Sequence, residues 1–175
     1  MEKSFKSKIV LITGASSGIG HAAAKTFASQ GADLLLTGRN ESVLFKLNEE
    51  LKEYNGRYEL YPGDLTDKSF RQGLINHLLD TFERLDVLIN AAGIIGSGTI
   101  ENTSLDEYDR MMDINLRTVF HLTQLAVPHI KKTKGNIVNV GSVTGTRAFP
   151  GILSYCVSKA GLDQLTRVLA LELAK

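Results

Sequence analysis

The segment SYCVSKAG, residues 154–161, places a tyrosine and a lysine four positions apart, Tyr155 and Lys159. On an α-helix, side chains at positions i and i+4 lie on the same face, with Cβ atoms about 5–6 Å apart. A cation held there favours the phenolate form of a tyrosine over the phenol, which suits the tyrosine to proton transfer. On spacing alone, an exposed Tyr–Lys pair on a helix surface is the commoner explanation, so the rest of the chain must decide.

A second candidate site is the glycine-rich segment TGASSGIG, residues 13–20, which contains Gly14, Gly18 and Gly20. Glycine permits a tight turn at a strand end and lets the backbone approach a pyrophosphate closely. A helix that begins there offers free N–H groups and the positive end of its dipole to phosphates. The alternative is a tight connection that binds nothing. The position of the segment between the first apolar run and the first helical stretch favours a dinucleotide site.

Short apolar runs alternate with helical stretches along the chain. The apolar runs are 8–13, 33–37, 86–90 and 136–140, with a weaker one at 58–62. The helical stretches are 18–30, 41–54, 67–83, 104–131 and one from about 151 onward. Continuous apolarity is typical of parallel strands that are covered on both faces. The alternation predicts an α/β fold with a doubly wound, Rossmann-like parallel sheet of five strands. We expect Pro128 to end or kink the fourth helix.

Composition narrows the function classes. The 175 residues suit one domain, and 20 basic against 19 acidic residues give a formal net charge of +1, which is no footprint for nucleic acid. The single cysteine, Cys156, excludes an internal disulfide, and no signal peptide or apolar run of membrane-spanning length is visible. The four histidines show no metal-ligand spacing. We therefore expect a cytoplasmic protein that has no metal.

The motifs together resemble the short-chain dehydrogenase/reductase family. The matching features are TGASSGIG, NAAG at 90–93, Asn115, Ser142 and YCVSK at 155–159, in the family's order and spacing and over nearly all of the chain. The resemblance implies a single NAD(P)-binding domain over residues 1–175, which ends within the helix that carries Tyr155 and Lys159. It also implies an oxidoreductase that transfers a hydride between nicotinamide and a carbonyl or secondary alcohol.

The resemblance assigns four catalytic residues. Tyr155 is the general acid in reduction and the general base in oxidation. Ser142, at the end of the fifth strand, hydrogen-bonds the substrate oxygen. Lys159 stabilises the phenolate and bonds the nicotinamide ribose, and Asn115 holds a water that relays protons. Without the resemblance, Asn115 is an ordinary polar residue inside a helix.

Further residues are expected to bind the cofactor. Besides Tyr155 and Lys159, they are Gly14, Ser16, Ser17, Gly18, Ile19, Gly20, Arg39, Asp64, Leu65, Asn90 and Gly93. Asp64 and Leu65 match the family's adenine site, although an aspartate there also suits a helix cap, for which Thr66 or Asp67 is better placed. The alternative for Asn90 and Gly93 is a tight turn.

The choice of dinucleotide depends on the end of the second strand. An acidic residue there selects NAD, whereas this chain has Thr37, Gly38 and Arg39. A guanidinium grips a phosphate through paired, charge-assisted hydrogen bonds, and Ser16 can add a hydroxyl. The sequence therefore favours NADP(H) over NAD(H). If Arg39 only stacks on the adenine, either cofactor fits.

The resemblance stops at Lys175. Family members continue through a further strand, a loop over the nicotinamide, a substrate lid and a last strand, and they are usually homo-oligomers. We therefore expect either a fragment of a longer protein or a shortened form with impaired catalysis, in which 136–140 is an open sheet edge. The second function class is accordingly a nucleotide-binding protein without turnover. The four intact catalytic residues favour the enzyme.

Overall fold

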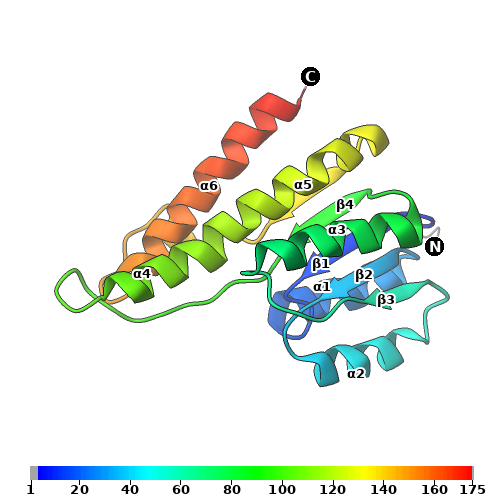
Figure 1. Ribbon diagram of the computed structural model, residues 1–175, viewed down its shortest axis with the longest axis horizontal. Helices are drawn as coiled ribbons and strands as arrows, with labels where there is room; N and C mark the ends of the chain where they lie inside the picture. The colour runs from blue at the N-terminus through cyan, green and yellow to red at the C-terminus, as the bar shows by residue number, and fades with distance from the viewer. Residues whose placement is uncertain (1–3, 175) are drawn as a thin grey trace. The chain divides into compact units, whose positions relative to one another are not determined.

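The computed structural model describes residues 4–174. It confirms the predicted parallel sheet, whose strand order is β3-β2-β1-β4-β5 (Figure 1). The strands are β1 (Ile9–Thr13), β2 (Asp33–Thr37), β3 (Tyr58–Leu60), β4 (Val87–Asn90) and β5 (Asn136–Asn139). The direction of winding reverses at β1, which pairs with β2 on one side and β4 on the other. In such sheets, ligands bind beyond the carboxyl ends of the strands at this switch point.

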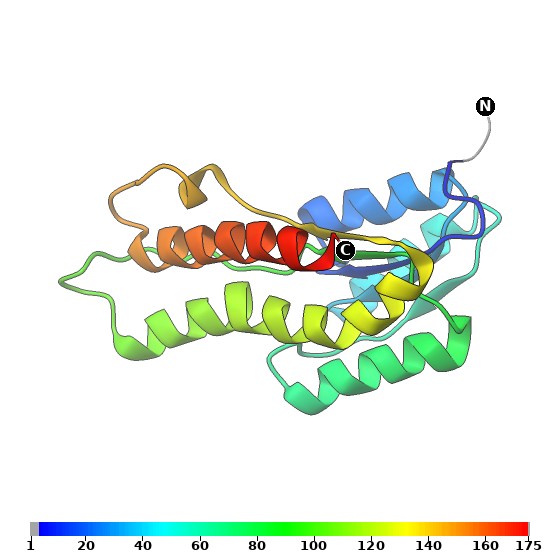
Figure 2. The same ribbon diagram turned by 90° about the horizontal axis from the view of Figure 1, so that it is seen from above.

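The strands have the apolar composition that burial on both faces requires. Every residue of β1 is buried, and alternate residues belong to different cores. Val10 and Ile12 pack with the helices α1 (Gly18–Ser29) and α2 (Glu41–Leu51). Leu11 packs with the helix α3 (Lys68–Phe82). Figure 2 shows α1 and α3 on opposite faces of the sheet.

The edge strand β5 departs from the sequence prediction. Its residues alternate between exposed and half-buried, and Val138 is 43% exposed, so the expected cover on both faces is wrong for this strand. The reason is its place in the sheet: β5 is the last strand in the order, and no strand of the described chain pairs with it on the outer side.

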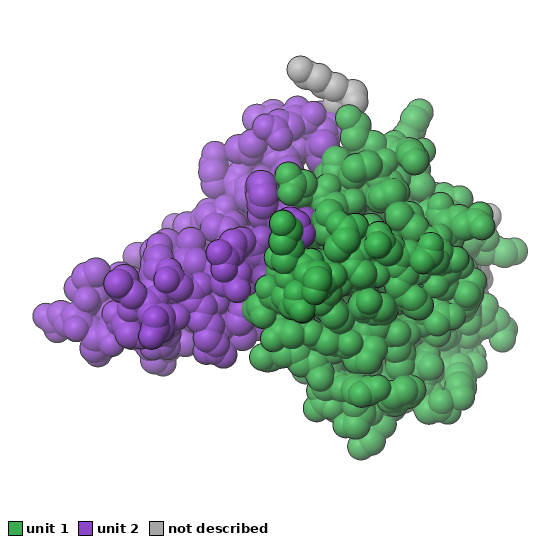
Figure 3. Space-filling model, viewed as in Figure 1, with its two compact units in different colours: residues 1–92, 122–138 green, residues 93–121, 139–175 purple. Residues whose placement is uncertain are grey.

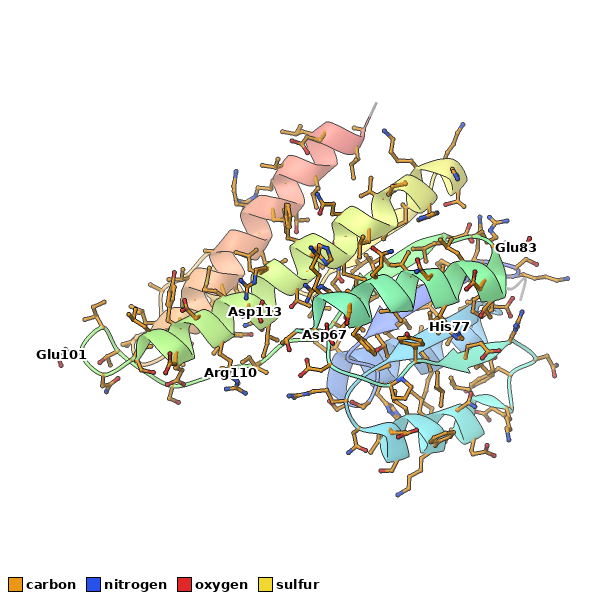
Figure 4. All side chains as sticks on the ribbon, viewed as in Figure 1. Asp67, His77, Glu83, Glu101, Arg110 and Asp113 are labelled. Carbon is orange, nitrogen blue, oxygen red and sulfur yellow. The ribbon has the colours of Figure 1, made fainter. Side chains whose placement is uncertain are left out.

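The helices α2 and α3 begin with a side-chain cap. The side chain of Asn40 accepts a hydrogen bond from Val43 N at the start of α2. Asp67, labelled in Figure 4, accepts from Ser69 N at 2.7 Å and caps α3. A side-chain acceptor at this position satisfies one of the unpaired N–H groups of a helix end. The preference for Thr66 or Asp67 over Asp64 as the cap is confirmed, with Asp67 as the residue used.

The long helix predicted over 104–131 is divided in the structure. It consists of α4 (Leu105–Met112), a π-helical turn (Asp113–Arg117) and α5 (Thr118–Thr133). The helix does not end at Pro128, which lies inside α5. Proline removes one backbone hydrogen bond from a helix, but Ala126 and Ile130 on either side of it are buried in the core, and that packing maintains the helix. A last helix, α6, spans Leu153–Leu173.

The chain forms two compact units (Figure 3). Unit 1 comprises residues 1–92 and 122–138, and unit 2 comprises residues 93–121 and 139–175. The single domain over 1–175 stays a prediction. No helix in the described chain is both long and apolar enough to cross a lipid bilayer.

Candidate functional site

The glycine loop of unit 1 needs glycine at two positions for clear steric reasons. Gly14 has a φ of +66°, and a Cβ on it would lie 2.8 Å from the Cα and N atoms of Ala92. A Cβ on Gly20 would overlap the carbonyl oxygen of Gly14. The turn after β1 is therefore packed backbone against backbone, as a loop that admits a pyrophosphate must be.

The N-terminus of α1 is free to receive an anion. Its N-cap residue, Ser17, makes no side-chain capping bond, and the first turn holds no acidic residue. Gly18 enters the helix with a φ of +52°, and Ile19 is 63% exposed although it is apolar. Free N–H groups and the helix dipole favour a phosphate there. The residues present thus fit the dinucleotide that the loop sequence predicts.

Thr13 is a residue of this site that the sequence analysis missed. Its Oγ1 accepts hydrogen bonds from Ala91 N and Ala92 N, both at 3.1 Å, and donates to Ile89 O at 3.3 Å. The last residue of β1 thereby holds the segment after β4 against the glycine loop. The only sequence signal was a threonine at the strand end, which is not distinctive.

Asn90, predicted to contact the cofactor, is buried below this segment. Its Nδ2 donates a hydrogen bond to Thr123 Oγ1 at 3.3 Å. This contact joins the end of β4 to the unit 1 part of α5. Asn90 therefore has a structural role in the described chain, and its contact with cofactor stays a prediction.

The residues expected at the adenosine end of the cofactor lie close to one another. A Cβ on Gly38 would lie 3.0 Å from Ser16 Oγ, so the glycine loop and the end of β2 are in contact. Gly63 N donates to Gly38 O at 3.0 Å. This bond brings the exposed carboxylate of Asp64 and the exposed guanidinium of Arg39 to the same sheet end.

The side chains of Asp64 and Arg39 differ in their hydrogen bonding within the protein. Asp64 Oδ1 accepts from Thr66 N at 2.9 Å, which closes a turn before α3. The exposed side chain of Arg39 makes no hydrogen bond or ion pair with any residue of the described chain. Leu65, which follows Asp64 in the chain, is buried and packs in the hydrophobic core.

In unit 2, Asn115 is buried inside the π-helical turn and is only 1% exposed. Its Oδ1 accepts from Ile94 N and its Nδ2 donates to Ile94 O, both at 2.9 Å. Nδ2 also lies 3.1 Å from Ser158 Oγ. π-Helical turns frequently occur at functional sites, where they redirect a side chain. Here the turn aims the Asn115 amide at the segment that follows β4.

Lys159 is the buried cation of unit 2, with 6% of its surface exposed. Its Nζ donates to Val140 O at 2.7 Å and lies 5.8 Å from the centre of the Tyr155 ring. The pKa of Lys159 lies below its usual value, because burial lowers it by more than the nearby charge of Asp163 raises it. The predicted Tyr155–Lys159 pair is therefore formed by a buried lysine, which excludes an ordinary exposed pair on a helix surface.

Gly93 completes this arrangement. A Cβ on Gly93 would lie 3.3 Å from Asn115 Oδ1 and 3.8 Å from Lys159 Nζ. The asparagine amide and the lysine ammonium therefore both lie close to the backbone of Gly93.

Ser142 begins a short 3₁₀ turn, Val143–Gly145, and its Oγ accepts from Thr144 N at 3.2 Å. Within residues 4–174, no hydrogen bond joins Ser142 to Tyr155 or Lys159. The structure thus brings together Asn115, Gly93, Lys159 and Tyr155, and it places Ser142 on the adjoining loop.

Ser158 was also missed by the sequence analysis. It is fully buried, donates to Tyr155 O at 2.8 Å and accepts from Asn115 Nδ2. It links the helix of the Tyr–Lys pair to the π-helical turn. The serine is visible within YCVSK, but only its flanking tyrosine and lysine had an evident chemical use.

Residues 8–175 match the family model for the short chain dehydrogenases. A 3-oxoacyl-(acyl-carrier-protein) reductase from Thermotoga maritima is 36% identical over 95% of this chain and 68% of its own length. A meso-2,3-butanediol dehydrogenase from Serratia marcescens is 34% identical over 96% of this chain and 66% of its own length.

Solved structures agree with the curated relatives. A short-chain dehydrogenase/reductase of unknown function from Caenorhabditis elegans, crystallised with cofactor, superposes with a TM-score of 0.92. It is 35% identical, and the match covers 97% of this chain and 66% of that one. The chain belongs to the short-chain dehydrogenase/reductase family of NAD(P)-dependent oxidoreductases.

Proposed function

We propose that this protein interconverts a carbonyl group and a secondary alcohol, with NADP(H) as cofactor and Tyr155 as the general acid and base. The observation that carries the proposal is the buried Lys159 ammonium, which Val140 O holds 5.8 Å from the centre of the Tyr155 ring. A cation fixed beside a phenol favours loss of the phenolic proton. The nicotinamide, when bound, supplies or accepts the hydride.

The protein residues account for the proton and for orientation. In reduction, the Tyr155 hydroxyl donates its proton to the oxygen that becomes the alcohol, and Ser142 Oγ donates a hydrogen bond to the same oxygen. A ribose hydroxyl or a relay water that reaches Asn115 Oδ1 and Lys159 Nζ would meet one acceptor and one cationic donor. Oxidation uses the same groups in the opposite direction.

The preference for NADP(H) is supported by the end of β2. Arg39 is exposed there without a protein partner in the described chain, and Ser16 Oγ lies directly over Gly38. A 2′-phosphate offers two oxygens to a guanidinium and one to a hydroxyl. No carboxylate at the end of β2 opposes that charge.

The substrate class is proposed at the level of the reacting group. The two curated relatives are named for a 3-oxoacyl substrate and for a diol, which share a carbon that carries an oxo or a hydroxyl group. Tyr155 and Ser142 would recognise that oxygen alone. We therefore propose a ketone or secondary alcohol as the reactive centre.

Tyr155→Phe tests the mechanism, because it removes the phenolic proton and keeps the ring beside Lys159. We expect turnover of a panel of ketones to fall by about 100-fold or more, while NADPH binding, followed by fluorescence, changes less than about twofold. Tyr108→Phe, the same change on α4, is the matched control and should keep full activity.

The outcomes separate the two function classes. Near-full turnover of Tyr155→Phe would refute the proposed role of the tyrosine. NADPH binding without turnover of any ketone or alcohol by the unaltered chain would instead indicate a nucleotide-binding protein.

A further inference from the structure

The carboxylate of Asp163 lies against the loop that carries Ser142. A Cβ on Gly141 would lie 3.0 Å from Asp163 Oδ1, and a Cβ on Gly145 would overlap Asp163 Oδ2. These two glycines flank Ser142 in the chain. With the carboxylate in this position, residues 141–145 approach it closely at two points that both lack a side chain.

The same carboxylate lies one helical turn from Lys159. Residues 159 and 163 are at positions i and i+4 of α6, so their side chains share one face of the helix. In the described chain, the side-chain Nζ of Lys159 makes one hydrogen bond, to the neutral carbonyl of Val140. A buried ammonium without a negative charge nearby is costly, and it tends to lose its proton.

Few groups near Lys159 can supply a negative charge to its ammonium. Tyr155 and Asp163 face it from α6, and they are the titratable groups next to it in the described chain. The other segments packed against it present the Val140 carbonyl and the Asn115 amide, which are both neutral. Asp163 is therefore the carboxylate available to Lys159.

We propose that Asp163 is a positioning residue of the proton-transfer site, where its carboxylate keeps the buried Lys159 charged and seats the Ser142 loop against α6. This inference rests on the proposed role of Lys159 beside Tyr155. Burial lowers the pKa of Lys159, and the Asp163 charge opposes that effect. The Asp163 side chain would thus affect both the charge state of Lys159 and the position of Ser142.

The test is a direct titration of Lys159 in the cofactor-free chain, followed by the NMR signal of its ¹³Cε and assigned by comparison with Lys159→Arg. Asp163→Asn keeps the shape of the side chain between the two glycines and removes its charge. We expect the Lys159 midpoint to fall by about 0.3 pH units or more. Glu172→Gln, an equal charge change near the end of α6, should leave the midpoint unchanged.

Packing and charge are separated by a second variant, Asp163→Ala. Equal falls in Asp163→Asn and Asp163→Ala support the proposal. An unchanged midpoint in Asp163→Asn would overturn it, whether or not Asp163→Ala shifts. An equal fall in Glu172→Gln would also overturn it, because the effect would then be one of net charge.

A measurement on the unaltered chain covers the case in which the variants do not fold. The ¹³Cγ signal of Asp163 should show an inflection at the midpoint of Lys159, and its absence would contradict the proposal. None of these titrations uses cofactor or substrate. A failure here is therefore distinct from a failure of the proposed oxidoreductase activity, which the Tyr155→Phe kinetics report.

Discussion

Asn115 brackets the backbone of Ile94: its amide oxygen accepts from Ile94 N and its amide nitrogen donates to Ile94 O, each at 2.9 Å. The two residues are 21 positions apart in the chain. Because Ile94 follows Gly93, this pair of bonds also fixes the glycine that borders Asn115 and Lys159. The asparagine therefore has a structural function in addition to any contact with water.

Asn115→Asp tests that bracket. A carboxylate still accepts from Ile94 N but cannot donate to Ile94 O, and it repels that carbonyl. We expect a loss of about 1–3 kcal/mol in the free energy of unfolding at pH 7, measured by urea denaturation. Asn102→Asp is the control, since Asn102 uses only its oxygen, to accept from Thr99 N. It should change stability by less than about 0.5 kcal/mol, and equal losses in the two variants would refute the argument.

Gly14→Ala should be more harmful than Gly18→Ala. Both positions have a positive φ, which costs a residue with a side chain about 1–2 kcal/mol. A Cβ on Gly18 has no atom within 4 Å, whereas a Cβ on Gly14 meets the backbone of Ala92. We expect Gly14→Ala to lose at least about 1 kcal/mol more in urea denaturation. Comparable losses would mean that the contact with Ala92 relaxes freely.

Arg39→Ala tests the choice of cofactor. If the guanidinium binds the 2′-phosphate, its removal should weaken NADPH binding at least about tenfold, or about 1.4 kcal/mol, with little change for NADH. Fluorescence titrations of both cofactors measure this. Lys46→Ala removes the same charge from an exposed position on α2 and should leave both affinities nearly unchanged. Equal losses for NADPH and NADH in Arg39→Ala would show that Arg39 does not recognise the phosphate.

The lowered pKa of Asp86 predicts how the free energy of unfolding depends on pH. Burial raises its pKa, but hydrogen bonds from Arg84, Ile9 N and Lys8 outweigh that effect and hold the pKa of Asp86 below its usual value. A carboxyl with a lowered pKa stabilises the folded state above its unfolded pKa, and the benefit is lost as the pH falls through the folded pKa. Asp86→Asn should therefore cost about 2 kcal/mol at pH 7.

The difference between Asp86→Asn and the unaltered protein should shrink as the pH falls below about 4. Urea denaturation at pH 7, 5 and 3.5 measures it. Asp80→Asn, a change of equal charge on the exposed side of α3, serves as the control and should have little effect at any of these values. A cost for Asp86→Asn that does not vary with pH would contradict the assignment.

Local chemistry explains what could be predicted from the sequence. The five strands and the helices α1 to α3 follow from the alternation of apolar runs and helical stretches, a pattern that acts over a few neighbouring positions. The glycine loop could be predicted because its glycines all lie within eight residues, 13–20. The Tyr155–Lys159 pair requires only one turn of α6.

Tertiary structure decided the rest, because it concerns partners that are far apart in the chain. Thr13 meets Ala91 across 78 positions, and Lys159 meets Val140 across 19, so neither contact has a local sequence signal. α5 continues through Pro128 because core packing outweighs one lost hydrogen bond. Likewise, nothing in the local sequence distinguishes Gly141 and Gly145 from other loop glycines, and only the fold brings the Asp163 carboxylate against both.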